Sequence, residues 1–160
     1  YAKNTHQPCV GIDVYLPGLL QVMQQALQYD LNHIRMVHGD VLAVLPCLPR
    51  HQANSIFVLF ADPWPKKKQQ KRRLIQRYFI NTLLTLLKHE GRLWIATDCD
   101  DYAAHINHVL SSLPIEVERD LPLPIRPTKY QKRAIKLGHS VHVWALSHLS
   151  AIQHQDDESK

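Results

Sequence analysis

The chain has 160 residues, of which 45% are apolar, so it is long enough to bury a core and short enough to form one domain. Its net charge of +5 and sequence pI near 9.2 are compatible with an anionic partner without requiring one. No apolar run reaches the length of a membrane span and no signal peptide is visible, so we expect a cytoplasmic protein with no membrane partner.

Strand and helix patterns alternate along the first half of the chain. Residues 9–14 predict a short buried strand, and residues 17–29 predict a helix with a proline in its first turn. A second strand is expected over residues 34–37. A short helix over residues 41–48 and a third strand over residues 55–60 follow.

The second half continues this alternation. Apolar residues at helical spacing predict a helix over residues 74–89, which ends at a turn containing Gly91. A second amphipathic helix is expected over residues 100–113. The remaining elements are strands, predicted over residues 92–96, 115–119 and 140–146. Such alternation implies βαβ units, and hence an α/β fold with a mostly parallel sheet. We expect one domain over residues 1–150, followed by a polar tail over residues 151–160.

Cysteines and histidines form no pattern typical of a disulfide framework or a metal centre. The three cysteines are scattered, which indicates a reducing compartment. His105 with His108, and His139 with His142, have H-x-x-H spacing but lack a third ligand, so we expect no metal. The sequence contains no G-x-S-x-G motif and no obvious Cys/His nucleophile pair, so nothing in it suggests covalent catalysis.

Four predicted strands end at, or just before, an aspartate: Asp13, Asp40, Asp62 and Asp98. The carboxyl ends of parallel strands lie at one edge of a sheet, where open α/β sheets bind their ligands. Each aspartate could instead be a helix N-cap. Four acids at one edge favour a functional site over four independent caps.

The segment FADPWPKKKQQKRRL, from Phe60 to Leu74, is the most informative stretch. It places Asp62 and a Pro63-Trp64-Pro65 corner at the end of a buried strand. Six cations follow: Lys66, Lys67, Lys68, Lys71, Arg72 and Arg73. Clustered cations beside an aromatic side chain and an acid indicate a site that works on nucleic acid. A solvated charged face and a nuclear-localisation patch remain alternatives.

Five segments in order resemble the bacterial type of the tRNA (guanine-N7-)-methyltransferase family, which depends on S-adenosylmethionine. GIDV is similar to the family's G-I-E-V element, and HGD to its third-strand aspartate element. FADPWPKKKQQKRRL is very close to F-x-D-P-W-x-K-x-x-x-x-K-R-R. ATDCDDYAAHI resembles A-T-D-x-x-x-Y-x-x-H, and RPTKYQKRAIKLGH resembles R-P-x-T-K-F-E-x-R-G-x-x-L-G-H.

The resemblance implies a Rossmann-like class I methyltransferase sheet, mostly parallel with an antiparallel C-terminal strand. It implies an RNA-binding enzyme of tRNA modification that transfers a methyl group from S-adenosyl-L-methionine to guanine N7 in the variable loop of tRNA. Asp13 would bind the cofactor ribose, Asp40 would lie beside the adenine, and Asp62 would be the catalytic aspartate, also in contact with the cofactor. The substrate contacts would be Lys66, Lys68, Lys71, Arg72, Arg73, Asp98, Arg126, Thr128, Lys129, Tyr130 and Gln131.

The chain departs from the family pattern, most of all before Val10. The glycine-rich E-x-G-x-G-x-G element and its strand have no counterpart before Val10, so we expect the first strand of the fold to be absent and the chain to be the C-terminal portion of a longer protein. Asp13 and Gln131 each stand where the family has glutamate. The alternatives to the enzyme are a non-catalytic RNA-binding relic and a methyltransferase with another substrate. We expect a monomer or a homodimer.

Overall fold

The computed structural model describes residues 7–149, which form two compact units. Among these residues, the first unit comprises residues 7–49 with Pro124–Arg126, and the second comprises Arg50–Leu123 with residues 127–149. The single domain expected over residues 1–150 stays a prediction, and the expected tail over residues 151–160 lies outside the described residues. No helix in residues 7–149 is long and apolar enough to cross a membrane.

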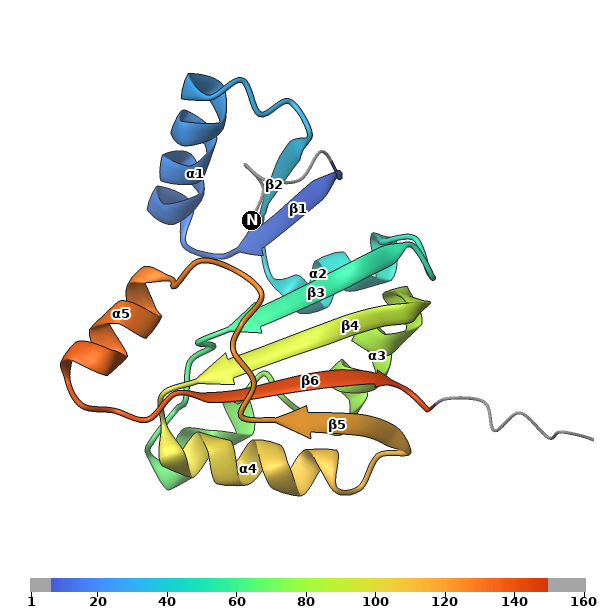
Figure 1. The fold of residues 1–160 in the computed structure, drawn as a ribbon, viewed down its shortest axis with the longest axis vertical. Coiled ribbons are helices and arrows are strands. Elements are labelled where there is room, and N and C mark those ends of the chain that lie inside the picture. Colours follow the sequence, from blue (N-terminus) through green and yellow to red (C-terminus); the bar gives the residue numbers. More distant parts are fainter. Residues whose placement is uncertain (1–6, 150–160) are drawn as a thin grey trace, which may run out of the picture. The chain divides into compact units, whose positions relative to one another are not determined.

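The first unit is built on a pair of parallel strands, β1 (Cys9–Asp13) and β2 (Ile34–His38). The helix α1 (Leu16–Gln28) connects them (Figure 1). Pro17 lies in its first turn, where a missing amide donor costs nothing. The short α2 (Val41–Val44) follows β2 and continues as the 3₁₀ helix η2 (Leu45–Cys47). These elements confirm the strands and helices predicted for this part of the sequence.

The second unit contains a mixed sheet of four strands in the order β3-β4-β6-β5. These strands span Ala53–Leu59, Leu87–Thr97, His142–His148 and Ile115–Arg119, respectively. β3 and β4 are parallel, whereas β6 pairs antiparallel with both β4 and β5. Since β6 alone runs against the other three strands, the prediction of an α/β fold with an antiparallel C-terminal strand is confirmed for this sheet.

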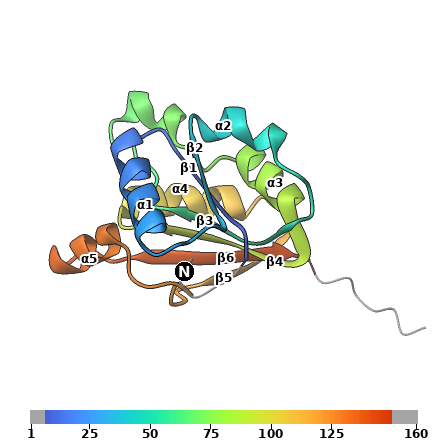
Figure 2. The ribbon, with the colours of Figure 1, turned by 90° about the horizontal axis from the view of Figure 1, so that it is seen from above.

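The hydrophobic core of the second unit lies between its sheet and two helices, α3 (Arg77–Leu86) and α4 (Asp100–Leu110). Figure 2 shows both helices on the same face of the four-stranded sheet. The stripe predicted for α4 is buried as expected: Tyr102, Ile106 and Val109 are at most 8% exposed. This packing fixes the carboxyl end of β4, from which α4 begins.

The predicted limits of the helix over residues 74–89 and of the strand after it were wrong. The helix expected over residues 74–89 is confined to Arg77–Leu86, because Ile75 packs in the core outside the helix and β4 already begins at Leu87. Gly91 is not a turn but a buried residue inside β4. A Cβ atom there would lie 2.8 Å from the Ala53 carbonyl oxygen, where the β3–β4 register shifts, so the close approach of the two strands requires glycine.

One helix was not predicted. The basic stretch after the proline-rich loop forms α5 (Lys129–Lys136), and β6 begins at His142 rather than at residue 140. Thr128 caps α5 by accepting a hydrogen bond from the Gln131 amide at 3.1 Å. Gly138, with φ of +73°, lies just beyond its C-terminal end.

Candidate active site

Two aspartates lie at the carboxyl ends of the parallel strands of the first unit. Asp13 is the last residue of β1, and its Oδ1 accepts a hydrogen bond from the Tyr15 amide at 2.9 Å. Asp40 caps α2, with Oδ1 accepting from the Leu42 amide at 2.9 Å. Both aspartates are exposed. Within the described residues, Asp40 therefore acts as a helix N-cap, which was one of the two roles that the sequence left open.

Asp62 and Asp98 lie at the carboxyl ends of the parallel strands of the second unit. Asp98 follows β4 directly, and the chain between β3 and Asp62 is tied to β4 by the Phe60 amide, which donates to the Ala96 carbonyl at 2.8 Å. Asp62 is exposed, and no group within residues 7–149 forms a hydrogen bond or ion pair with its carboxylate. Asp98 lies 3.7 Å from His139, Oδ2 to Nδ1. The convergence of all four aspartates stays a prediction, since the two pairs belong to different units.

The corner that carries Asp62 is strained on both sides. Phe60 has φ of +54° and Trp64 has φ of +43°, and both are in the left-handed region that bulky residues avoid. Such conformations cost roughly 1–3 kcal/mol each and persist only where the surrounding structure fixes them. The contacts that hold this corner are therefore part of the site.

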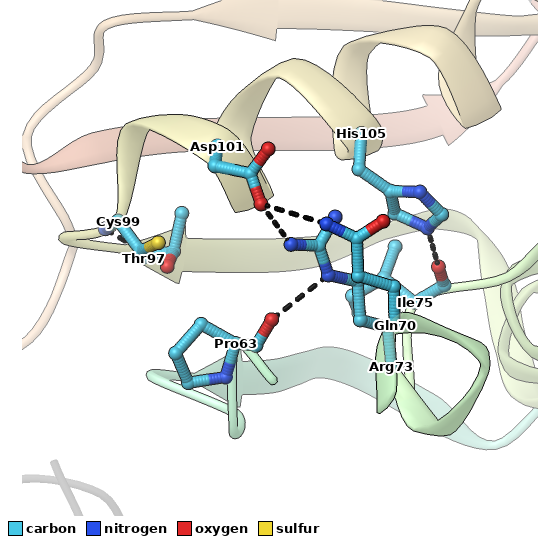
Figure 3. Close-up of polar contacts among 8 residues, drawn as sticks. All are labelled: Pro63, Gln70, Arg73, Ile75, Thr97, Cys99, Asp101 and His105. Atoms are coloured by element: carbon cyan, nitrogen blue, oxygen red, sulfur yellow. Dashed lines mark hydrogen bonds and ion pairs between the residues drawn. The ribbon is translucent and has the colours of Figure 1, made fainter. Parts of the chain in front are cut away.

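Arg73 ties the corner to α4 (Figure 3). Its Nε donates to the Pro63 carbonyl oxygen at 2.8 Å, and its Nη2 forms an ion pair with the Asp101 carboxylate. The guanidinium lies over the ring of Tyr102, 5.1 Å from the centroid. Gln70 also donates to the Asp101 carboxylate, at 3.3 Å. One buried cation thus links the Pro-Trp-Pro corner to the first turn of α4.

The remaining cations of this segment form an exposed surface, which we call the cationic arm. It comprises Lys66 and the 3₁₀ helix η3 (Lys67–Arg72), and none of these side chains is buried. Its exposed cations are Lys66, Lys67, Lys68, Lys71 and Arg72. The Arg72 guanidinium lies over the Trp64 ring at 4.9 Å from the centroid, a cation–π contact that covers one face of the indole.

The helix α5 packs its first turn against the strained corner. The Tyr130 ring stacks on Phe60 with ring centroids 6.1 Å apart, and Lys129 Nζ lies 5.1 Å from the Tyr130 centroid. The Gln131 Oε1 atom is buried and has no hydrogen-bond partner within the described residues. Tyr130, with Lys129 on its ring, is thus brought beside the chain that leads into Asp62. Arg126 is exposed and belongs to the first unit.

Tyr102 and His105 of α4 brace the segment that follows the arm. The Tyr102 hydroxyl accepts a hydrogen bond from the Ile75 amide at 3.0 Å, and the His105 Nε2 atom lies 2.9 Å from the Ile75 carbonyl oxygen. Burial raises the pKa of Tyr102 above its ordinary value, although the Ile75 amide and the Arg73 guanidinium favour the phenolate. The phenol is therefore neutral near pH 7.

Sequence reasoning did not assign a role to Phe60, Asp101, Tyr102 or His105. The signal that could have found the last three is the segment ATDCDDYAAHI, in which they occur together. Phe60 gave no signal, because an aromatic residue at the end of an apolar run is expected in a core. No cluster of three or more histidine, cysteine, aspartate or glutamate side chains suited to a metal occurs in the part of the chain that the structure describes.

The chain matches the family model of putative methyltransferases over residues 2–144. It is 38% identical over 141 residues to the tRNA (guanine-N(7)-)-methyltransferase of Acidithiobacillus ferrooxidans. The aligned residues make up 84% of this chain and 62% of that protein. The chain thus spans less than two thirds of the length of this relative.

Two solved structures are similar in fold at low sequence identity. An rRNA methylase from Streptococcus thermophilus has a TM-score of 0.60 and 13% identity, covering 88% of this chain and 73% of that one. A SAM-dependent O-methyltransferase from Thermotoga maritima has a TM-score of 0.57 and 13% identity, covering 89% and 50%. The fold is the α/β fold of class I methyltransferases with a mixed sheet, and the chain belongs to the family of putative methyltransferases.

Proposed function

We propose that the full-length protein transfers a methyl group from S-adenosyl-L-methionine to N7 of a guanine in tRNA. The observation that carries this proposal is the carboxylate of Asp62, which is exposed, has no partner within residues 7–149, and is set in a strained corner directly before the cationic arm. A curated relative with 38% identity is named for this reaction, which supports the choice of substrate and of the modified atom.

The donor set of the first unit suits the nucleoside part of the cofactor. Only Oδ1 of Asp13 is used by the Tyr15 amide, so Oδ2 can accept a hydrogen bond from a ribose hydroxyl at the end of a strand, as carboxylates do in dinucleotide folds. Asp40, at the neighbouring strand end, would lie beside the adenine. The cofactor supplies an electrophilic methyl group, and the chain's residues bind and orient its acceptor.

The acceptor atom needs little chemical activation. Guanine N7 carries a free lone pair, so no base is required to deprotonate it before it attacks the methyl group. Positioning and electrostatics should therefore supply most of the rate enhancement. Asp62 would accept hydrogen bonds from the guanine N1–H and N2–H₂ groups, and its negative charge would offset the positive charge that methylation leaves on the ring.

The contacts with the rest of the tRNA would be electrostatic. Lys66, Lys68, Lys71 and Arg72 are exposed along the cationic arm, where phosphates can reach them. Arg72 would have to leave the face of the Trp64 ring to contact a phosphate. Lys129 and Tyr130 present a cation and an exposed ring from the first turn of α5. Asp98, Thr128, Gln131 and Arg126 complete the proposed substrate contacts. The cytoplasmic location and the monomeric or homodimeric state stay predictions.

The test of the enzyme is the Asp62→Ala variant of the full-length protein. Loss of a preorganised electrostatic partner of the transition state should lower kcat by about 10²–10³-fold. Nucleoside mass spectrometry of treated tRNA should show 7-methylguanosine with the parent protein and almost none with the variant. The matched control is Glu90→Ala, which removes an exposed carboxylate near the opposite end of β4 and should keep the parent rate. Parent activity in Asp62→Ala would refute the assignment.

A thermal-shift titration with S-adenosylhomocysteine separates the enzyme from the RNA-binding relic. A ligand that binds only the native state raises Tm in proportion to the logarithm of its concentration above Kd. A rise in Tm supports the enzyme. No rise, together with tRNA binding that depends on the cationic arm, would favour the relic.

A further inference from the structure

Arg73 differs from the five other cations of its segment. Lys66, Lys67, Lys68, Lys71 and Arg72 are all exposed, whereas Arg73 is only 4% exposed. A side chain that contacts RNA phosphates must present its charge to solvent before the RNA arrives. The guanidinium of Arg73 is instead inside the protein, so its partners have to be sought there.

Those partners come from two separate segments, as Figure 3 shows. Arg73 Nε donates at 2.8 Å to the carbonyl oxygen of Pro63, the residue directly after Asp62. The Nη2 group pairs with the Asp101 carboxylate in the first turn of α4, and the guanidinium plane covers the Tyr102 ring. Two hydrogen-bonding directions and one stacking face of the arginine are therefore used within the protein.

These contacts bear on the direction of the Asp62 side chain. The ring of Pro63 fixes its own φ, so a hydrogen bond to the Pro63 carbonyl oxygen also restrains the peptide bond that joins it to Asp62. The left-handed Phe60 and Trp64 on either side have other conformations of lower energy. Without an anchor the corner would be expected to relax and move the carboxylate.

We propose that Arg73 is a positioning residue that holds the Asp62 carboxylate in place, and that it does not contact tRNA phosphates. Its importance for catalysis rests on the proposed function, whereas its structural role does not. To reach a phosphate, Arg73 would have to lose all three of its contacts at once, with the Pro63 carbonyl oxygen, the Asp101 carboxylate and the Tyr102 ring. The Pro63 carbonyl oxygen, which is part-buried, would lose its Arg73 hydrogen bond, and this loss opposes the movement.

The experiment compares Arg73→Gln with Lys71→Gln in the full-length protein. Both variants lose one positive charge from the same segment, but Lys71 is exposed on η3. Hydrogen–deuterium exchange of peptides covering residues 60–75 reports on the corner without any need for activity. Binding of tRNA is measured between 50 and 200 mM salt, and kcat and KM are measured separately.

We expect Arg73→Gln to exchange at least tenfold faster over residues 60–75, to lower kcat at least tenfold, and to keep the parent salt dependence of tRNA binding. Lys71→Gln should exchange like the parent and should reduce the slope of log K against log salt by about 1, the value for one lost phosphate contact. Asp101→Asn, which keeps the shape of the partner and removes its charge, should reproduce the faster exchange in part.

Two results would overturn the proposal. One is an Arg73→Gln variant whose salt slope falls as in Lys71→Gln while exchange over residues 60–75 stays at the parent rate. The other is an Arg73→Gln variant with parent exchange and parent kcat. If the parent protein itself proved unable to methylate tRNA, the proposed function would fail, while the exchange and salt measurements would still decide the role of Arg73.

Discussion

The hydrogen bond between the Tyr102 hydroxyl and the Ile75 amide is the contact whose removal can be predicted most sharply. Tyr102→Phe keeps the ring, which is 1% exposed, and deletes the acceptor of a buried amide. An amide left unpaired in the interior costs about 1–3 kcal/mol. For a chain of this size each kcal/mol corresponds to about 2–4 °C in Tm, so a fall of roughly 2–12 °C is expected at pH 7.

The loss should depend on pH in a definite direction. Burial raises the pKa of Tyr102 in the folded protein, so below about pH 10 both folded and unfolded states keep the proton and the contribution of the hydroxyl is complete. Between the ordinary pKa and the raised one, only the unfolded chain releases the proton. The stability of the parent therefore falls as the pH rises through this window. Phenylalanine has no proton to lose, so the deficit of the variant should shrink.

Urea denaturation followed by tryptophan fluorescence measures this effect, because Trp94 and Trp144 are buried in the four-stranded sheet. Tyr78→Phe is the matched control, since Tyr78 is 56% exposed and its loss should change stability by less than about 0.5 kcal/mol. A Tyr102→Phe deficit below about 0.5 kcal/mol at pH 7, or one that grows between pH 9 and pH 11, would refute the reasoning.

Two further substitutions test other parts of the second unit. Gly91→Ala should destabilise the protein by about 1–3 kcal/mol, because the new methyl group meets backbone oxygens of Ala53 and Lys88 at 2.8 and 3.0 Å; a Tm equal to that of the parent would contradict the close approach. Gln131→Leu should leave the unliganded protein as stable as the parent or more stable by about 1 kcal/mol, because it removes a buried oxygen that has no donor among the described residues; a clear loss of stability in thermal denaturation would show that a partner exists.

Hydrophobic patterning predicted the strands and most of the helices, because buried strands and amphipathic helices carry periodic signals. It placed β5 over Ile115–Arg119, where the structure has it, and identified the buried stripe of α4. It failed for α5, because Ala134 is the single buried residue of that helix and most of the others are polar or charged. The capping threonine and the following Gly138 were the available signals, and they concern local geometry rather than burial.

The limits of α3 and the interior position of Gly91 could not be read from the sequence for a related reason. Ile75 has the apolar character of a helix face, but its amide and carbonyl groups are bound by Tyr102 and His105, so the chain is not helical there. The partners come from an element about thirty residues away. The periodicity of apolar residues within one segment cannot predict contacts with a segment so far away in the sequence.

The sequence predicted the positions of the aspartates at the strand ends and the position of the cationic arm after β3. Asp13, Asp40 and Asp98 lie at or next to the ends of their strands, as expected. Arg73 could not be distinguished from its neighbours by sequence alone, because six cations in eight residues look alike until the fold buries one of them. The strain at Phe60 and Trp64 was equally invisible, because it depends on the backbone conformation of the corner.

The position of β6 in the sheet also determines the order in which the strands can pair during synthesis. Within residues 7–149, β6 is the last strand in sequence, yet it lies between β4 and β5 and is the strand that pairs with β5. During synthesis on the ribosome, β5 must therefore wait unpaired until β6 has left the exit tunnel. Such late closure by distant segments is slow and leaves strand edges open to aggregation in the meantime. A stop codon before His142 should consequently yield an insoluble product rather than a shortened soluble protein.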